Sequence, residues 1–484
     1  MPPHSDFRPS VAHAALGDAF FDPVDAARFP QHVLRHRDQR WAARVGLDGL
    51  SDEEWLAHFG GFAPLPGSFE QPLALRYHGH QFRSYNPDLG DGRGFLFAQM
   101  HDLLDGRLLD LGTKGSGTTP WSRSGDGRLT LKGGVREVLA TSMLEALGVN
   151  TSKSLSLVET GEELYRGDEP SPTRASVLVR LSHSHIRIGT FQRLAYLGET
   201  ELTLKLIDHA IRNYMPELWH DDMTLRVAGF LTEVSVRVAR LGGQWMAAGF
   251  VHGVLNTDNI NITGESFDYG PWRFLPTYQP KFTAAYFDHS GLYAFGRQPD
   301  TLLWNLARLG GCLLPLVEKP ALEGALASYW DNFHRGFAGA IIRRLGLRTQ
   351  GDEADGDLGR ALYVFLQETQ APYEQCFFDL YGGRARADRW KLSPSAAFYD
   401  APAFAEVRAM LSLYQPAASA QPGHAYFAAA TPCTMLVDDV EALWAPIAER
   451  DDWSHFHVKL DAIATMAQAY GTTPFPPPDR TTPA

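Results

Sequence analysis

Residues 252–259 read HGVLNTDN, and residues 268–271 read DYGP. An asparagine at position 259 is thus followed, nine residues later, by an aspartate that precedes an aromatic residue and a glycine. Asn259 and Asp268 would supply amide and carboxylate oxygens. These are hard ligands that suit Mg²⁺, which binds through few protein groups and takes phosphate oxygens and water for the rest of its shell. The pattern predicts a divalent metal site at Asn259 and Asp268; a loop capped by Asn and Asp, without a metal, is the alternative.

The same stretch differs from the catalytic loop of protein kinases at one important position. The kinase loop reads H-R-D-x-x-x-x-N, in which the aspartate is the base and the asparagine binds metal. His252 and Asn259 keep the separation of the kinase histidine and asparagine, but Val254 stands where the aspartate is expected. The base of an ordinary kinase is therefore missing from its usual place, and an aspartate is found instead at position 258, beside Asn259.

The composition is that of an ordinary globular protein. The chain has 484 residues, of which 44% are hydrophobic and 21% charged, so it can bury a normal core and form a few domains of about 100–200 residues each. Asp and Glu number 56 against 44 Lys and Arg, and the formal net charge is -12. A protein that coats duplex nucleic acid is expected to be basic, so we expect no nucleic-acid partner.

The N-terminal residues, the length of the apolar stretches and the cysteines indicate in which compartment the protein works. Its first ten residues show no basic segment followed by an apolar run, and no apolar stretch approaches the ~18–20 residues of a membrane helix. The three cysteines, Cys312, Cys376 and Cys433, are far apart and contain no CxxC pair, which indicates free thiols in a reducing compartment. We expect a cytoplasmic protein without membrane contact.

Hydrophobic periodicity divides the chain into a strand-rich first half and a helix-rich second half. Residues 94–98 and 108–111 are short apolar runs between Gly and Asp turns, and residues 177–181 form a similar run; all three are typical of strands. Apolar residues recur every four positions from Val135 to Leu147, which predicts a helix that ends at Gly148. After about residue 200 the spacing is helical.

This pattern predicts an α+β protein with two lobes and a helical extension. The expected units are an N-terminal extension of helical fragments (1–70), a sheet-rich N-lobe (71–200), a helical C-lobe that carries the 252–271 loop (201–330), a helical C-terminal extension (331–472), and a disordered Pro- and Thr-rich tail (473–484).

Several glycines and cations in the first half could bind phosphate. Glycines at positions 90 and 92 would let a turn approach a phosphate closely, and Arg93 could pair with it, although Gly-Asp-Gly is also an ordinary tight turn. Lys114 ends a predicted strand, and Glu137 lies on the next helix, which is how kinases orient a phosphate-contacting lysine. With Arg93 and Lys114, Arg180 and Arg187 could supply four cations for a triphosphate, or each could be a surface residue.

Taken together, these motifs resemble the SelO/YdiU family of pseudokinase-fold protein adenylyltransferases. The matching stretches follow the family's order and are GHQF at 79–82, LGDGR at 89–93, KGSG at 114–117, TPWSR at 119–123, GDGR at 125–128, RE at 136–137, SHIR at 184–187, HGVLNTDN at 252–259 and DYGP at 268–271. They cover nearly half of the chain, from about residue 76 to residue 308.

The resemblance implies a bilobal, kinase-like fold in which ATP binds in a flipped orientation, with its α-phosphate facing the acceptor. AMP would pass to a Ser, Thr or Tyr hydroxyl of a protein substrate, and pyrophosphate would be released. Asn259 and Asp268 match the family's ligands for Mg²⁺ or Mn²⁺, Asp258 matches its proposed proton acceptor, and Glu137 would orient Lys114. The residues that match its nucleotide contacts, with Asp268 added, are Gly90, Gly92, Arg93, Lys114, Asp126, Gly127, Arg180, Arg187 and Asp268.

The sequence departs from the family pattern at three places. Arg83 stands where many members have Gly, and Lys132-Gly133-Gly134 replaces the more usual Arg-Ser-Ser. Residues 471–484 lack the cysteine or selenocysteine near which many relatives end, so no redox control through it is predicted.

Three other functions are compatible with the same motifs. They are a conventional protein kinase that uses Asp258 as its base, a UMP transferase that uses Mn²⁺, and a nucleotide-sensing scaffold without chemistry.

Overall fold

One antiparallel sheet dominates the N-terminal part of the computed structural model, which describes residues 6–167, 169–386 and 388–472. Among these residues, nine strands form an antiparallel sheet in the order β2-β4-β7-β8-β11-β10-β3, with β1 paired to β7 and β9 paired to β11. The strands are β1 (Pro9–Ser10), β2 (Phe21–Pro23), β3 (Val33–Arg37), β4 (Leu73–Leu75), β7 (Leu96–His101), β8 (Leu108–Lys114), β9 (Leu129–Thr130), β10 (Lys153–Leu164) and β11 (Thr173–Ser182). The three strands expected from apolar runs are therefore present as β7, β8 and β11.

The N-terminal 70 residues differ from the sequence-based expectation of helical fragments. Two helices are present, α1 (Gln39–Arg44) and α2 (Asp52–Phe59), but β1, β2 and β3 belong to the large sheet. These strands are two to five residues long and half exposed or mixed in burial. They become strands by pairing with β7, β4 and β10. Because this pairing depends on distant segments, their own sequence need not show the alternation of polar and apolar residues that marks a strand.

Side chains alternate across the sheet and place its two faces against different helices. On β11, Val177 and Val179 pack with the tryptophans of α1 and α2, whereas Leu178 packs in the larger core with α3 (Leu131–Ala146). Successive residues of a strand point to opposite faces, so this division follows from the strand geometry. Helix α3 begins at the cap Thr130, whose hydroxyl accepts a hydrogen bond from the Gly133 amide (3.1 Å), and ends before Gly148 at φ +76°, as expected.

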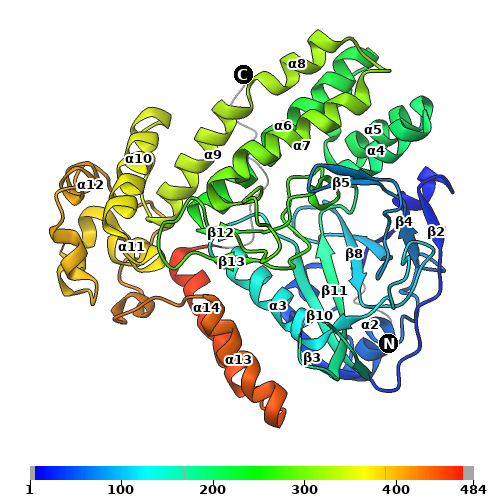
Figure 1. Cartoon of the computed structure of the whole chain (residues 1–484), viewed down its shortest axis with the longest axis horizontal. Helices are drawn as coiled ribbons and strands as arrows, with labels where there is room; N and C mark the ends of the chain where they lie inside the picture. The colour runs from blue at the N-terminus through cyan, green and yellow to red at the C-terminus, as the bar shows by residue number, and fades with distance from the viewer. Residues whose placement is uncertain (1–5, 168, 387, 473–484) are drawn as a thin grey trace.

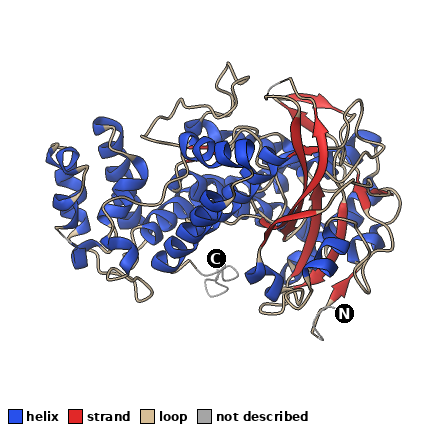
Figure 2. Cartoon of the chain, turned by 90° about the horizontal axis from the view of Figure 1, so that it is seen from below, coloured by secondary structure: helices blue, strands red, loops and turns tan. Residues whose placement is uncertain are grey.

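Helices make up the C-terminal part, which lies opposite the sheet in Figure 2. They are α4 (Ile188–Leu197), α5 (Thr200–Tyr214), α6 (Met223–Ala247), α7 (Gln298–Leu313), α8 (Lys319–Ala327), α9 (Tyr329–Arg344), α10 (Asp352–Thr369), α11 (Tyr373–Leu380), α12 (Phe404–Leu411), α13 (Val437–Arg450) and α14 (Ser454–Tyr470). The chain is thus α+β, with a sheet-rich N-terminal part and a helical C-terminal part. The predicted tail at 473–484 lies outside the described residues.

The last two helices return to the sheet-rich part. In Figure 1, α14 lies beside α3, and the two helices pack together. No helix among the described residues combines the length and the apolar character needed to cross a membrane.

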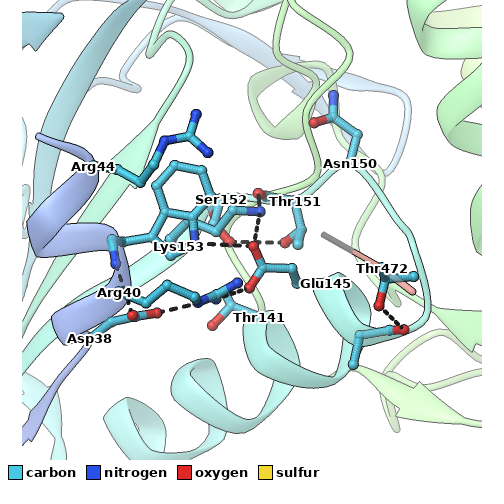
Figure 3. A network of polar contacts seen from close by, with 12 residues as sticks. Asp38, Arg40, Arg44, Thr141, Glu145, Asn150, Thr151, Ser152, Lys153 and Thr472 are labelled. Carbon is cyan, nitrogen blue, oxygen red and sulfur yellow. Dashed lines mark hydrogen bonds and ion pairs between the residues drawn. The ribbon is translucent and has the colours of Figure 1, made fainter. Parts of the chain in front are cut away.

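The C-terminal end of α3 is held by a polar network that joins distant segments (Figure 3). Glu145, in the last turn, accepts a hydrogen bond from the Trp41 indole (3.0 Å), forms an ion pair with Lys153 Nζ (3.3 Å), and is bound by Arg40. A carboxylate at a helix C-terminus is unfavourable beside the helix dipole. Its presence there is explained by these partners, which tie α3 to α1 and β10.

We expect Glu145→Ala to lower the free energy of unfolding by about 2 kcal/mol, because Lys153 and the Trp41 indole would lose a largely buried partner. Denaturant titration would measure the change. The matched control is Glu441→Ala, which removes an ion pair of α13 with Lys132 (2.8 Å) whose carboxylate side chain is 50% exposed. That pair should contribute less than about 1 kcal/mol. Equal stability of the two variants would contradict the role given to Glu145.

Candidate functional site

A cavity of about 620 Å³ lies among the glycine-rich turn at 90–94, the ends of β8 and β11, the loop at 121–128 and the segment that contains Asp258 and Asp268. Ten residues singled out in the sequence line it, namely Gly90, Gly92, Arg93, Lys114, Asp126, Gly127, Arg180, Arg187, Asp258 and Asp268. Asn259 is not among the described lining residues. The structure thus brings together all but one of the predicted site residues, and their roles remain predictions.

Strand register places Lys114 and Arg180 on the same face of the sheet. Lys114 of β8 pairs with Leu178 of β11, two residues before Arg180, and residues two apart on a strand share a face. That face is the one covered by α3, so the Lys114 ammonium meets Glu137 and forms an ion pair with it. The kinase-like pairing expected from the sequence is therefore present.

Asp268 completes this cluster from the helical part of the chain. Its Oδ1 lies 2.8 Å from Lys114 Nζ and 3.3 Å from an Arg180 guanidinium nitrogen. Burial alone would raise the pKa of Asp268, but Lys114, Arg180 and Arg93 hold it well below its usual range. The carboxylate is therefore ionised at neutral pH.

Asp258 is in a very different environment from Asp268. It lies in the 3₁₀ turn η3 (Thr257–Asn259), and its buried Oδ1 has no hydrogen-bond partner among the described residues. Burial raises the pKa of Asp258 to about 7, against the opposing effect of Arg187. A buried, cavity-lining carboxylate with a pKa near neutrality has the protonation behaviour that suits a proton acceptor.

The turn that carries Asp258 is held by its neighbours on both sides. The Thr257 hydroxyl donates a hydrogen bond to Gln192 Oε1 (2.5 Å) and accepts one from the His80 amide (2.7 Å). A Cβ at Gly79 would lie 2.8 Å from Asp258 Oδ1, so the hairpin β5 (Gly79–Gln81) and β6 (Ser84–Asn86) can pack this closely only with glycine there. These contacts hold the turn that carries Asp258.

The glycine-rich turn approaches its neighbours too closely for side chains. A Cβ at Gly90 would lie 2.4 Å from the Trp121 ring, and one at Gly92 would lie 2.9 Å from the Trp121 carbonyl oxygen. Trp121 is itself anchored through its indole N–H, which donates to Asp22 of β2 (2.9 Å). Gly90 and Gly92 therefore allow Trp121 to pack closely on the turn, and they also line the cavity.

Several lining residues were not recognised as site residues from the sequence. Asp91 accepts a hydrogen bond from Arg187 (3.4 Å), whose guanidinium also stacks on the Tyr77 ring. Arg166 forms an ion pair with Asp126 (2.8 Å). Asp91 stands inside the quoted glycine motif, which could have drawn attention to it. No sequence signal marks Arg166, because only folding brings it to Asp126.

The donor atoms around the cavity fit a hard divalent cation. Asp268 presents a carboxylate to the cavity, and the Asn259 amide N–H donates to the Val254 carbonyl (3.0 Å), which leaves the amide oxygen to accept or coordinate. Among the described residues, no three His, Cys, Asp or Glu side chains gather as a metal centre by themselves. Such a set suits Mg²⁺ or Mn²⁺ that takes further oxygens from a phosphate substrate and water.

Known proteins resemble this chain over most of its length. The family model described as "Protein adenylyltransferase SelO" matches residues 4–464. A protein of Synechocystis named "Protein nucleotidyltransferase YdiU" is 46% identical over 464 residues, which is 92% of this chain and 95% of the relative. Proteins of the same name from Trichormus variabilis and Gloeobacter violaceus are 43% and 44% identical, over 93% and 96% of this chain and 94% and 95% of their own lengths. The chain therefore belongs to the SelO/YdiU family of nucleotidyltransferases.

Proposed function

We propose that the protein transfers AMP from ATP to Ser, Thr or Tyr hydroxyls of protein substrates and releases pyrophosphate. The observation that carries this proposal is Asp258, a buried carboxylate that lines the cavity and has no hydrogen bond on Oδ1, whereas valine occupies the position of the kinase base. The family description and the relatives' names support the reaction class.

In the proposed reaction the acceptor oxygen attacks the α-phosphorus and a new P–O bond forms. The bond between the α-phosphorus and the bridging oxygen of the β-phosphate breaks, and pyrophosphate leaves. Asp258 takes the proton of the acceptor hydroxyl. Lys114, Arg93, Arg180 and Arg187 stabilise the negative charge of the phosphates, which is the main means of catalysis in phosphoryl transfer.

The proposal includes the flipped orientation of ATP and a kinase-like arrangement of residues 71–200 and 201–330 as two lobes around the cavity. The missing aspartate at position 254 supports a reaction at a phosphate other than the γ-phosphate. Asp268 and Asn259 would hold Mg²⁺ or Mn²⁺, which would supply Lewis-acid stabilisation of the phosphate charge. The cations of the site lie in a chain of net charge -12, a contrast that would direct a polyphosphate to the cavity.

Labelled ATP tests the proposal directly. The protein would be incubated with Mg²⁺ or Mn²⁺ and with ATP labelled at the α- or the γ-phosphate, and incorporation would be measured in the chain itself and in casein. We expect α-label and not γ-label to enter protein. Incorporation of γ-label alone would indicate a conventional kinase, and ATP binding without any incorporation would indicate a nucleotide-sensing scaffold. A parallel reaction with α-labelled UTP would identify a UMP transferase.

A further inference from the structure

A tightly anchored loop at 119–125 covers the glycine-rich turn. The Thr119 hydroxyl donates to the Asp91 carbonyl (2.5 Å), and the Ser122 hydroxyl donates to the Gly92 carbonyl (2.5 Å). Within the loop, the Thr119 amide donates to the Ser122 hydroxyl (2.8 Å) and the Gly125 amide to the Ser122 carbonyl (2.7 Å). With Trp121 bound to Asp22, the loop is fixed to both the turn and β2.

Arg123 is at the tip of this loop, in a backbone conformation that is uncommon for arginine. Its φ is +54°, in the left-handed region, which costs a residue with a Cβ of the order of 1 kcal/mol. The nearest following glycine is Gly125, two positions further along, so the left-handed conformation falls on Arg123 and not on a glycine. Strained residues of this kind concentrate at binding and catalytic sites, where the surrounding structure holds them.

Arg123 lines the cavity, and its guanidinium is not bound by the protein. Its side chain, like that of Arg93, makes no hydrogen bond or ion pair with any residue that the structure describes, whereas Arg166 is paired with Asp126 and Arg128 with Glu162 (2.9 Å). An unpaired arginine held at the wall of a phosphate-binding cavity is free to form two parallel hydrogen bonds to phosphate oxygens.

Arg123 lines the same cavity as Asp258, the proposed proton acceptor. Other cations of the cavity are already held by carboxylates: Lys114 and Arg180 contact Asp268, and Arg187 is paired with Asp91. The phosphate that reacts must lie beside the proton acceptor, so Arg123 is a cation of this cavity that is available to meet it.

We propose that Arg123 binds the α-phosphate during transfer and stabilises the charge that develops on its oxygens and on the departing pyrophosphate. This inference rests on the proposed AMP transfer and adds a residue to it. The contribution is expected mainly in the transition state, because an exposed side chain on a loop tip is held by the phosphate rather than by the protein.

The test compares Arg123→Ala and Arg123→Lys with Arg360→Ala, which removes an exposed arginine of α10 that is paired with Asp357 and is not among the described residues that line the cavity. Two quantities are measured: the maximal rate of α-label incorporation into the chain itself and into casein, and the dissociation constant of Mg²⁺ and α,β-methylene-ATP by calorimetry. We expect Arg123→Ala to lower the maximal rate about 10²-fold or more and to change the dissociation constant less than about threefold. Arg123→Lys should be intermediate, since lysine keeps the charge without the planar fork, and Arg360→Ala should lose less than about threefold in rate.

Three outcomes would overturn the inference: a rate for Arg123→Ala within threefold of the wild type, a loss of binding as large as the loss of rate, or an equal loss in Arg360→Ala. Thermal melting of each variant, with Arg123→Lys as the milder change, separates a folding defect from a loss of chemistry. Failure of the proposed function itself is recognised separately, because the wild type would then incorporate no α-label; in that case the α-phosphate role of Arg123 falls with it.

Discussion

Asp258→Asn is expected to reduce AMP transfer by about 10²- to 10⁴-fold, the usual contribution of a positioned proton acceptor. Asparagine has nearly the same shape as aspartate but cannot take the proton of the acceptor hydroxyl. Because Asp258 Oδ1 has no hydrogen-bond partner among the described residues, the fold should not depend on its charge. We therefore expect the loss in the maximal rate, with ATP affinity and melting temperature close to those of the wild type.

Transfer of α-label, calorimetric binding of α,β-methylene-ATP and thermal melting would separate these quantities. Asp88→Asn is the matched control, since Asp88 is an exposed aspartate next to the glycine-rich turn and is not among the described residues that line the cavity. That control should keep the wild-type rate. A variant at position 258 that transfers AMP within threefold of the wild type would show that another group, or solvent, accepts the proton.

Asp268→Asn is expected to have the second large effect, a loss of about 10³-fold or more in transfer. The substitution removes the carboxylate that would bind the divalent ion and that also lies between Lys114 and Arg180. Stabilisation of phosphate charge by a metal is worth several kcal/mol, and each 1.36 kcal/mol corresponds to about tenfold in rate. Asparagine is chosen because Asp268 has φ +63°, a conformation that asparagine tolerates better than alanine.

A metal titration distinguishes this loss from misfolding. The wild type should lose transfer in EDTA and regain it with Mg²⁺ or Mn²⁺, whereas Asp268→Asn should remain inactive at metal concentrations far above those that saturate the wild type. Circular dichroism of the variant should match the wild type, and its melting temperature should stay above the assay temperature even though Lys114 and Arg180 lose a charged partner. Full recovery of the variant at high metal would indicate that other oxygens bind the ion, and wild-type activity in EDTA would remove the metal from the proposal.

Much of the fold could be predicted because its signals are local. The helix from Leu131 to Ala146 repeats apolar residues every four positions and ends before a glycine, and the structure confirms it as α3. Strands β7, β8 and β11 were recognised from short apolar runs, since buried central strands carry such runs. Strands β1, β2 and β3 were missed, because short edge segments become strands only through their partners.

In the candidate site, too, local features could be predicted from the sequence and contacts between distant segments could not. Motif residues such as Lys114, Glu137 and Asp268 could be identified one by one, because each stands in a recognisable local pattern. Contacts that join motifs could not: Trp121 and Asp22 are 99 positions apart, and Arg187 and Asp91 are 96 apart. Spacing of this length carries no information about proximity until the sheet and α4 have formed.

By itself, the sequence determined the α+β class, the motif residues and their order, and the replacement of the kinase base by Val254, because periodicity and residue type are properties of neighbouring positions. The tertiary structure alone decided which of these residues share a cavity and that Asp258 is buried with Oδ1 unpaired while Asp268 is neutralised by two cations. It also decided that Arg123 lines the same cavity without a hydrogen bond or ion pair to any residue that the structure describes. Burial and electrostatic environment depend on segments that are distant in the chain, and these two properties give chemically identical carboxylates different protonation behaviour.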